Sequence, residues 1–185
     1  MTEVSKIVPT LETERLILRG IEQRDFEPFA AFYASDGSRF VGGPMDDTAA
    51  WRKLAGYAGG WLLRGFGQFA VEEKASGKFA GVVGPYFPVG WPEPEIAWTI
   101  LPDFQGNGYA TEAAKRSLRF AYETLGWKTA ISSMDEGNKQ SVGVAGRLGA
   151  TFEGMAEVRP FGQLRVYRHI PPEEFLAEAN GRDAA

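Results

Sequence analysis

The stretch LPDFQGNGYATEA, residues 101–113, constrains the fold of this chain more than any other part of the sequence. It joins the apolar run EIAWTIL (95–101), which predicts a strand, to a run from Gly108 to Leu125 that predicts a helix. Gly106 and Gly108 lie in the turn between them. Such a turn is either an ordinary strand-to-helix connection or a cradle for phosphate, because the N–H groups and dipole of a helix start attract anions.

Three phosphate-binding patterns can be compared with this turn. A P-loop needs Lys and then Ser or Thr after its second glycine, where Tyr109 and Ala110 stand. A dinucleotide-binding turn needs a small residue in place of Thr111 and belongs in an early βαβ unit. The third pattern, Q-x-x-G-x-A, is satisfied by Gln105, Gly108 and Ala110. The turn therefore favours backbone binding of a pyrophosphate.

Composition limits the classes of function. The chain has 185 residues, which indicates one domain, and its net charge of -4 gives no broad attraction to nucleic acids or anionic membranes. It has no cysteine and a single histidine, His169, so a multi-histidine metal site or a catalytic triad cannot be assembled in the usual ways. We expect His169 to be a core or peripheral residue and expect no metal. Without an apolar run of membrane-spanning length or a signal peptide, the sequence predicts a cytoplasmic protein.

The order of expected elements indicates a mixed sheet in one α+β domain, residues 1–185. A short leader (about 1–10) and an acidic tail (about 174–185) are expected to be flexible. Strands are expected at 14–21, 66–74, 78–87, 95–101, 127–134 and in a last hairpin at 153–170. Helices are expected from Asp25 to about Ala34, after a cap at Asp47 or Thr48, from Gly108 to Leu125, and over 141–148. The apolar stripe of the second helix is predicted as Trp51, Leu54, Tyr57 or Ala58, Trp61 and Leu62.

Three stretches in the right order resemble the GNAT superfamily of acyl-CoA-dependent N-acetyltransferases. EIAWTILPDFQGNGYATEA is similar to its fourth strand, pyrophosphate loop and third helix, and NKQSVGVAGRLGATFEG (138–154) to its next motif. ETERLILRGIEQRDFEPF resembles the opening of the branch that includes ribosomal-protein N-terminal acetyltransferases. The resemblance implies a strongly twisted mixed sheet, splayed between its fourth and fifth strands and flanked by about four helices.

The resemblance also implies acetyl-CoA as cosubstrate, with its pantetheine inserted between the splayed strands. Ile100 matches the position whose backbone pairs with pantetheine, and Trp98 precedes it by one strand period. Few basic residues surround the loop in the sequence, so we expect mostly backbone contacts. The implied cofactor-binding residues are Trp98, Ile100, Gln105, Gly106, Asn107, Gly108, Tyr109, Ala110, Thr111, Asn138 and Ser141.

The implied reaction is direct attack of a primary amine on the thioester. Glu95 matches a carboxylate that many relatives carry and is the candidate general base; the other reading is an exposed strand-end glutamate, with Glu93 two residues away. The family's usual tyrosine acid is replaced by Ala145, which leaves Ser141 as the candidate partner of the leaving thiolate. Ser141 is equally well placed to cap a helix.

The sequence leaves the acceptor open between a protein N-terminus and a small amine. Asp46 and Asp47 could attract a cationic amine or cap the second helix. Because the usual acid is missing, an acyl-CoA-binding module with little or no catalytic activity is the alternative function. We expect a monomer or homodimer that binds neither nucleic acid nor membrane. Bulky aromatics that could belong to the core or wall the acceptor site are Trp51, Trp61, Phe66, Phe87, Trp91 and Trp98.

Overall fold

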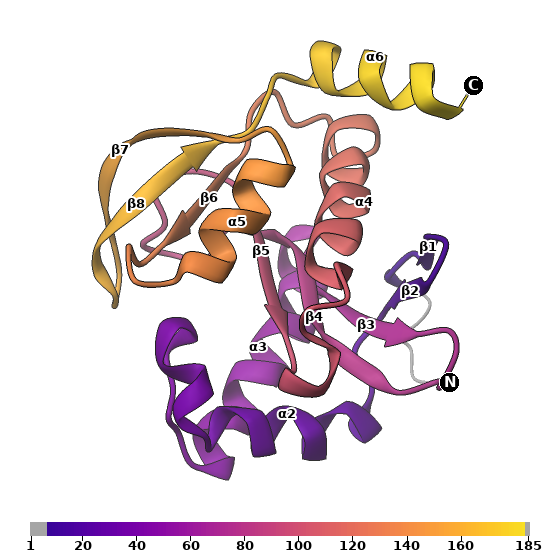
Figure 1. Ribbon diagram of the computed structural model, residues 1–185. Helices are drawn as coiled ribbons and strands as arrows, with labels where there is room; N and C mark the ends of the chain where they lie inside the picture. Colours follow the sequence, from indigo (N-terminus) through magenta and orange to yellow (C-terminus); the bar gives the residue numbers. More distant parts are fainter. Residues whose placement is uncertain (1–6, 184–185) are drawn as a thin grey trace.

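A mixed eight-stranded sheet forms the centre of the molecule in the computed structural model, which describes residues 7–183 (Figure 1). The strand order is β1-β2-β3-β4-β5-β6-β8-β7, and β5–β6 is the parallel pair while the others are antiparallel. The strands are β1 (Leu11–Glu12), β2 (Leu16–Arg19), β3 (Phe69–Glu73), β4 (Phe79–Tyr86), β5 (Glu95–Ile100), β6 (Ile131–Met134), β7 (Thr151–Val158) and β8 (Gly162–Arg168). The predicted α+β fold is confirmed.

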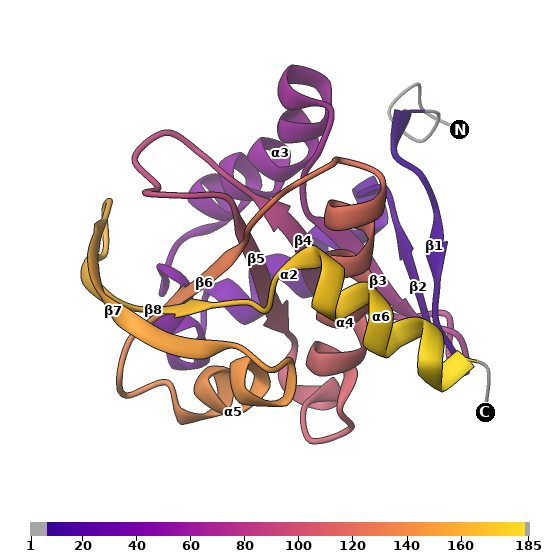
Figure 2. The ribbon, with the colours of Figure 1, turned by 90° about the horizontal axis from the view of Figure 1, so that it is seen from above.

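Helices cover both faces of the sheet (Figure 1, Figure 2). On one face, α4 buries Leu118 against a core that includes Val83 of β4. On the other, α2 and α3 bury Phe29 and Leu54 against a core that includes Val82, the neighbour that points the opposite way along β4. The helices are α2 (Phe26–Tyr33), α3 (Asp47–Arg64), α4 (Tyr109–Glu123), α5 (Lys139–Arg147) and α6 (Pro172–Asp183).

Strands β5 and β6 touch at one point and then separate. Glu95 pairs with Ile131, and this is the single register pair between them, whereas β4 and β5 pair over six positions from Tyr86↔Glu95 to Gly81↔Ile100. The predicted splay between the fourth and fifth strands of the family pattern is therefore present as the gap between β5 and β6. One edge of β5 has no strand partner beyond its first residue.

The start of α3 agrees with one of the sequence alternatives, and its buried stripe differs from the prediction. Its N-cap is Asp46, whose carboxylate accepts a hydrogen bond of 2.8 Å from the Ala49 N–H, so of the residues considered as caps neither Asp47 nor Thr48 has this role. Its buried stripe is Ala50, Leu54, Tyr57 and Trp61, while the predicted members Trp51 and Leu62 are 46% and 57% exposed.

Some described residues of the predicted leader and tail pack against the rest of the fold. Helix α6 occupies the region predicted as a flexible tail from about residue 174, and Figure 2 shows it lying across α4. Phe175 is 5% exposed, with its ring centroid 5.7 Å from that of Tyr122. In the predicted leader, residues 1–6 lie outside the described part of the chain, and Val8 is buried.

Asp25 does not cap α2 with its side chain, contrary to the prediction. Its carboxylate is fully buried and receives two hydrogen bonds of 2.8 Å from the Arg19 guanidinium and a third from the Glu22 N–H. Arg19 also pairs with Glu72 of β3 at 2.8 Å. This buried network fixes the start of α2 against the sheet.

We expect Asp25→Ala to lower the free energy of unfolding by about 3 kcal/mol, because it leaves the Arg19 charge buried with Glu72 as its remaining partner. Urea denaturation measures the change. Asp36→Ala, which removes an exposed carboxylate, serves as the control and should change stability by less than about 0.5 kcal/mol. Equal effects of the two substitutions would contradict the structural role of the Arg19–Asp25 pair.

Candidate active site

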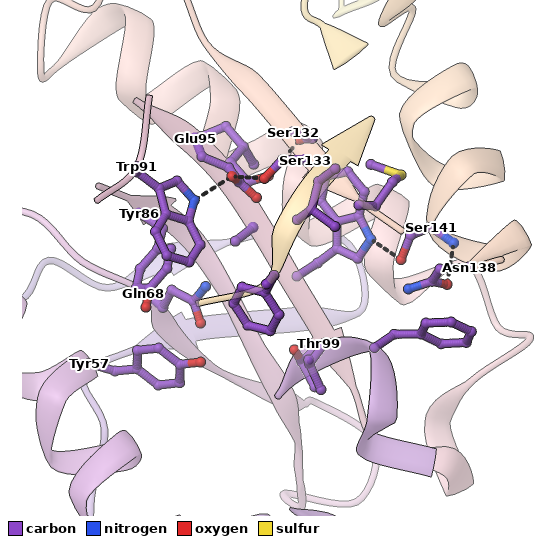
Figure 3. Close-up of a pocket in the computed structure, with 18 of the residues that line it drawn as sticks. Tyr57, Gln68, Tyr86, Trp91, Glu95, Thr99, Ser132, Ser133, Asn138 and Ser141 are labelled. Atoms are coloured by element: carbon purple, nitrogen blue, oxygen red, sulfur yellow. Dashed lines mark hydrogen bonds between the residues drawn. The ribbon is translucent and has the colours of Figure 1, made fainter. Parts of the chain in front are cut away.

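Two hollows meet above the open edge of β5. The first, here called the loop groove, lies between the 105–111 turn and the start of α5. The second, the Glu95 cavity, lies deeper between β5, β6, α3 and β4 (Figure 3). Residues that line both are Phe40, Val41, Trp98, Thr99, Asn138 and Ser141. A long ligand in the groove can therefore place one end in the cavity.

The backbone of β5 offers hydrogen-bonding groups to the loop groove. The Leu101 N–H donates to the Ala80 carbonyl of the β4 side at 2.9 Å. Because hydrogen-bonding direction alternates along a strand, Trp98 and Ile100 direct their backbone groups toward the gap. The Ile100 carbonyl accepts a bond of 2.8 Å from the Gln105 side-chain amide, which ties the turn to the strand. Trp98 and Ile100 thus face the gap between β5 and β6 with their backbone groups.

The turn leaves the first N–H groups of α4 open to the groove. Gly106 and Gly108 both have φ of +80°, a left-handed conformation that disfavours side chains with a Cβ. No side chain caps the helix at Gly108, so the N–H groups of the first turn have no intrahelical partner. Tyr109, Ala110 and Thr111 line the groove from this turn. The arrangement suits an anion.

Side chains on the far side of the turn hold it in place. Arg15 donates to the Asn107 carbonyl at 2.9 Å and pairs with Glu112 of α4. The Tyr109 hydroxyl donates to Glu73 of β3 at 2.6 Å. Asn107 does not line the groove, since its amide bonds back to neighbouring carbonyls of the turn. Asn107 and the Tyr109 side chain therefore shape the turn.

Basic residues reach the loop groove from α5, although the sequence analysis expected few around the turn. Lys139 and Arg147 both line it, and the Arg147 guanidinium donates to the Thr111 hydroxyl at 3.0 Å. Lys139 and Arg147 come 31 and 39 residues after Gly108 in the sequence, so no local pattern around the turn indicated them.

Glu95 is the buried carboxylate of the second hollow, and the alternative of an exposed strand-end glutamate is wrong. It is 5% exposed, and its Oε2 accepts bonds of 2.6 Å from the Trp91 indole N–H and the Ser133 hydroxyl (Figure 3). Burial raises the pKa of Glu95 to about 7, against the opposing effect of these two donors. Glu93 is paired with Arg168 at 2.6 and 2.7 Å and does not line the cavity.

Ser141 lies at the junction of the two hollows. The Trp98 indole N–H donates to its hydroxyl oxygen at 3.2 Å, while its backbone N–H donates to the Asn138 side chain at 3.2 Å (Figure 3). Asn138 is therefore the N-cap of α5, and the capping role considered for Ser141 is wrong. The Ser141 hydroxyl proton remains available to a ligand. Ala145 is fully buried and offers no such group.

Aromatic rings wall the Glu95 cavity. Tyr57 and Tyr86 have centroids 5.7 Å apart, Tyr86 and Trp91 5.1 Å, and Trp91 and Phe161 6.0 Å, each in edge-to-face geometry. We call these four residues the aromatic wall. Trp91 and Trp98 of the predicted set line the cavity, whereas Trp61 is in the core. Tyr86 and Phe161 carry no signal in the sequence, because they come from separate hairpins that only the fold brings together.

His169, the single histidine of the sequence, lines neither hollow. His169 is 2% exposed, its Nε2 lies 2.9 Å from the Ser132 hydroxyl, and burial lowers its pKa to about 4. It is the core residue that the sequence predicts. Within residues 7–183, no cluster of three or more His, Cys, Asp or Glu is arranged to hold a metal ion, and no helix is long and apolar enough to cross a membrane.

Comparison with known proteins gives one consistent family. The family model described as an acetyltransferase (GNAT) domain matches residues 15–151. The protein YkkB of Bacillus subtilis (strain 168) is 29% identical over 153 residues, covering 77% of this chain and 85% of YkkB. The crystal structure of an acetyltransferase from Agrobacterium tumefaciens str. C58 has a TM-score of 0.81 and 34% identity, covering 88% of this chain and 94% of its own.

A ribosomal-protein-S5-alanine acetyltransferase from Vibrio fischeri shares the fold. Its TM-score is 0.68 at 16% identity, covering 88% of this chain and 97% of the Vibrio chain. The two hollows therefore lie in a fold that several acetyltransferases share.

We expect Gly108→Val to weaken CoA binding at least tenfold in calorimetric titration, because a β-branched residue disfavours the left-handed conformation that aims the N–H groups into the groove. Gly77→Val is the matched control: Gly77 has φ of +67° in the β3–β4 turn, away from both hollows. The control should lose similar stability but bind CoA normally. Unchanged CoA affinity in Gly108→Val would contradict the anion-binding turn.

Proposed function

The chain belongs to the GNAT acetyltransferase family, and from this premise we propose that it transfers an acetyl group from acetyl-CoA to a primary amine. The amine attacks the thioester directly, within a complex that holds both substrates. The observation that carries the proposal is a buried carboxylate, Glu95, in a cavity that meets the loop groove at Trp98 and Ser141.

The loop groove suits CoA along its length. The uncapped start of α4 and the basic residues Lys139 and Arg147 favour the phosphates. The Trp98 and Ile100 backbone groups at the open edge of β5 favour an amide-bearing chain, which pairs with them as an added strand would. The thioester end then lies at the junction with the Glu95 cavity.

Glu95 serves as the general base in this proposal. Amines with ordinary pKa values near 10.4 are protonated at neutral pH and cannot attack until they lose a proton. A carboxylate with a pKa of about 7 is partly ionised at that pH and basic enough to accept the proton, directly or through water. Trp91 and Ser133 fix its orientation by donating to the same oxygen.

Ser141 stabilises the leaving thiolate of CoA in this proposal. As the nitrogen bonds to the carbonyl carbon, the C–S bond breaks, its electron pair remains on sulfur, and the nitrogen releases its remaining extra proton to solvent. The Ser141 hydroxyl, which already accepts from Trp98, donates to that sulfur and stabilises the thiolate. This arrangement compensates for Ala145 in place of the usual tyrosine.

Ala145 also supports the alternative, an acyl-CoA-binding module with little or no activity. A binding module has no use for a buried carboxylate whose burial raises its pKa, since that burial costs stability. The effects of Glu95→Gln and Ser141→Ala on turnover distinguish acetyl transfer from binding alone.

We expect Glu95→Gln to lower kcat about 100-fold with CoA affinity retained, because it removes the base and keeps an acceptor for Trp91 and Ser133. The ratio of wild-type to variant kcat/KM should rise with pH through about 7, where Glu95 loses its proton, and level off above it. A thiol-release assay from pH 5.5 to 9 measures both.

Stability provides the control for Glu95→Gln. The unfolded chain releases the Glu95 proton at lower pH than the folded chain, so wild-type stability declines as pH rises from 4.5 toward 7. The variant lacks this decline and should be at least as stable as wild type at pH 8. Wild-type turnover in the variant would exclude Glu95 as the base.

We expect Ser141→Ala to lower kcat by about tenfold, since it removes a charge-assisted hydrogen bond to the leaving sulfur. Alanine keeps the backbone N–H that Asn138 caps, so thermal unfolding should be unchanged. An acyl donor with a more acidic leaving thiol needs less help and should show a smaller loss. Equal losses with both donors would contradict the thiolate role.

A further inference from the structure

Lys53 is a charged group of the Glu95 cavity that the proposed chemistry does not use. It projects from α3 and lines the cavity together with the aromatic wall. Its ammonium nitrogen lies 5.2 Å from the ring centroid of Tyr33 and 5.7 Å from that of Tyr57. These contacts hold the Lys53 ammonium over two aromatic rings, at the side of the cavity that α3 forms.

No anion balances this cation. Among the described residues Lys53 forms no ion pair, and burial alone lowers its pKa to about 8, with no neighbouring charge contributing. Arg19, which is buried, is paired with two carboxylates. Lys53 is half-buried, and a charge withdrawn from water is ordinarily paired, so the described part of the chain supplies no anion for it.

The aromatic wall separates Lys53 from Glu95. Starting at Lys53, the sequence of contacts runs through Tyr57, Tyr86 and Trp91, and Trp91 donates to Glu95 at 2.6 Å. Lys53 and Glu95 therefore contact different members of the wall, Tyr57 and Trp91, and form no ion pair with each other. Lys53 also lies near Phe161, since a Cβ placed on Gly42 would be 3.3 Å from the Phe161 ring and 3.7 Å from the Lys53 nitrogen. A flat apolar body fits along such a wall, with one polar group at each end.

Gln68 provides a second sign that the cavity holds a polar ligand. It is 3% exposed, lines the cavity, and lies beside Tyr57 and Tyr86 in Figure 3. Its side-chain oxygen has no hydrogen-bond partner within the described residues. Because buried polar atoms are ordinarily paired, this oxygen is free to accept a hydrogen bond from a ligand or a water molecule in the cavity.

We propose that the acceptor is an amine that also carries a carboxylate, with the two groups at opposite ends of a flat apolar body: the carboxylate pairs with Lys53 and the amine faces Glu95. The proposal rests on the acetyl transfer proposed above and specifies its substrate class. A simple α-amino acid carries both groups on one carbon and cannot reach both ends of the wall. A neutral arylalkylamine leaves Lys53 without an anion.

The test compares 4-(aminomethyl)benzoate with 4-methylbenzylamine, which has the same shape but no carboxylate. In wild type, kcat/KM should be at least tenfold higher for the acid, through KM, because a charged hydrogen bond is formed. Lys53→Met should remove this preference and leave kcat/KM for 4-methylbenzylamine within about twofold. Lys53→Arg should retain most of it.

Lys115→Met is the matched control, since it removes an exposed lysine of α4 that lines neither hollow. It should keep the wild-type preference. Thermal unfolding and CoA affinity confirm that each variant is folded.

Three outcomes would overturn the proposal. One is equal kcat/KM for the two amines, and another is a preference that persists in Lys53→Met. The third is acetylation of phenylalanine or of a peptide N-terminus at much higher kcat/KM than the acid, which would assign a different acceptor while leaving acetyl transfer intact. Transfer to no amine at all, with CoA still bound, would overturn the proposed function as well.

Discussion

The separation of β5 from β6 after one residue pair is the constraint on which the site depends. A paired edge would bury the β5 backbone in the sheet, whereas the open edge presents Trp98 and Ile100 to a ligand. The same divergence places the start of α4 and the start of α5 on either side of one groove. It also opens the space in which Glu95, at the point of divergence, becomes buried without meeting a cation. One break in strand pairing thus creates both hollows.

The two hollows differ in their electrostatic character. The loop groove gathers positive potential from an uncapped helix start and from Arg147, which suits phosphates. The Glu95 cavity holds a carboxylate and an ammonium, and burial shifts the pKa of each toward neutrality, to about 7 for Glu95 and about 8 for Lys53. Such groups exchange protons or pair with a ligand near neutral pH. Ser141 lies where the two environments meet.

Local pattern and family resemblance together predicted the fold and the loop, but not most of the residues that line the Glu95 cavity. The Q-x-x-G-x-A turn is contiguous, so its glycines and the helix after it could be recognised in the sequence, whereas Glu95 and Ser141 were candidates because of the resemblance to the GNAT family. Lys53, Tyr86 and Phe161 come from three distant elements, and their convergence depends on how α3 and the β7–β8 hairpin pack. The buried stripe of α3 was misplaced for a related reason: Trp51 packs edge-on against Phe26 at the surface, and only tertiary contacts decide that. The sequence indicated Asp25 as a helix cap because it precedes α2. Its actual partner, Arg19, lies six residues earlier in β2, and local pattern does not show that pairing.

Amide hydrogen exchange by NMR, with and without saturating CoA, tests the central claim most directly. The account predicts that CoA slows exchange at Trp98 and Ile100, whose N–H groups face the gap, and leaves Ala97 and Thr99 nearly unchanged because their N–H groups already face β4. Protection that alternates in this way would show a ligand pairing with the open edge. Unchanged exchange at Trp98 and Ile100 in the CoA-bound protein would contradict the claim that the gap between β5 and β6 is the cosubstrate site.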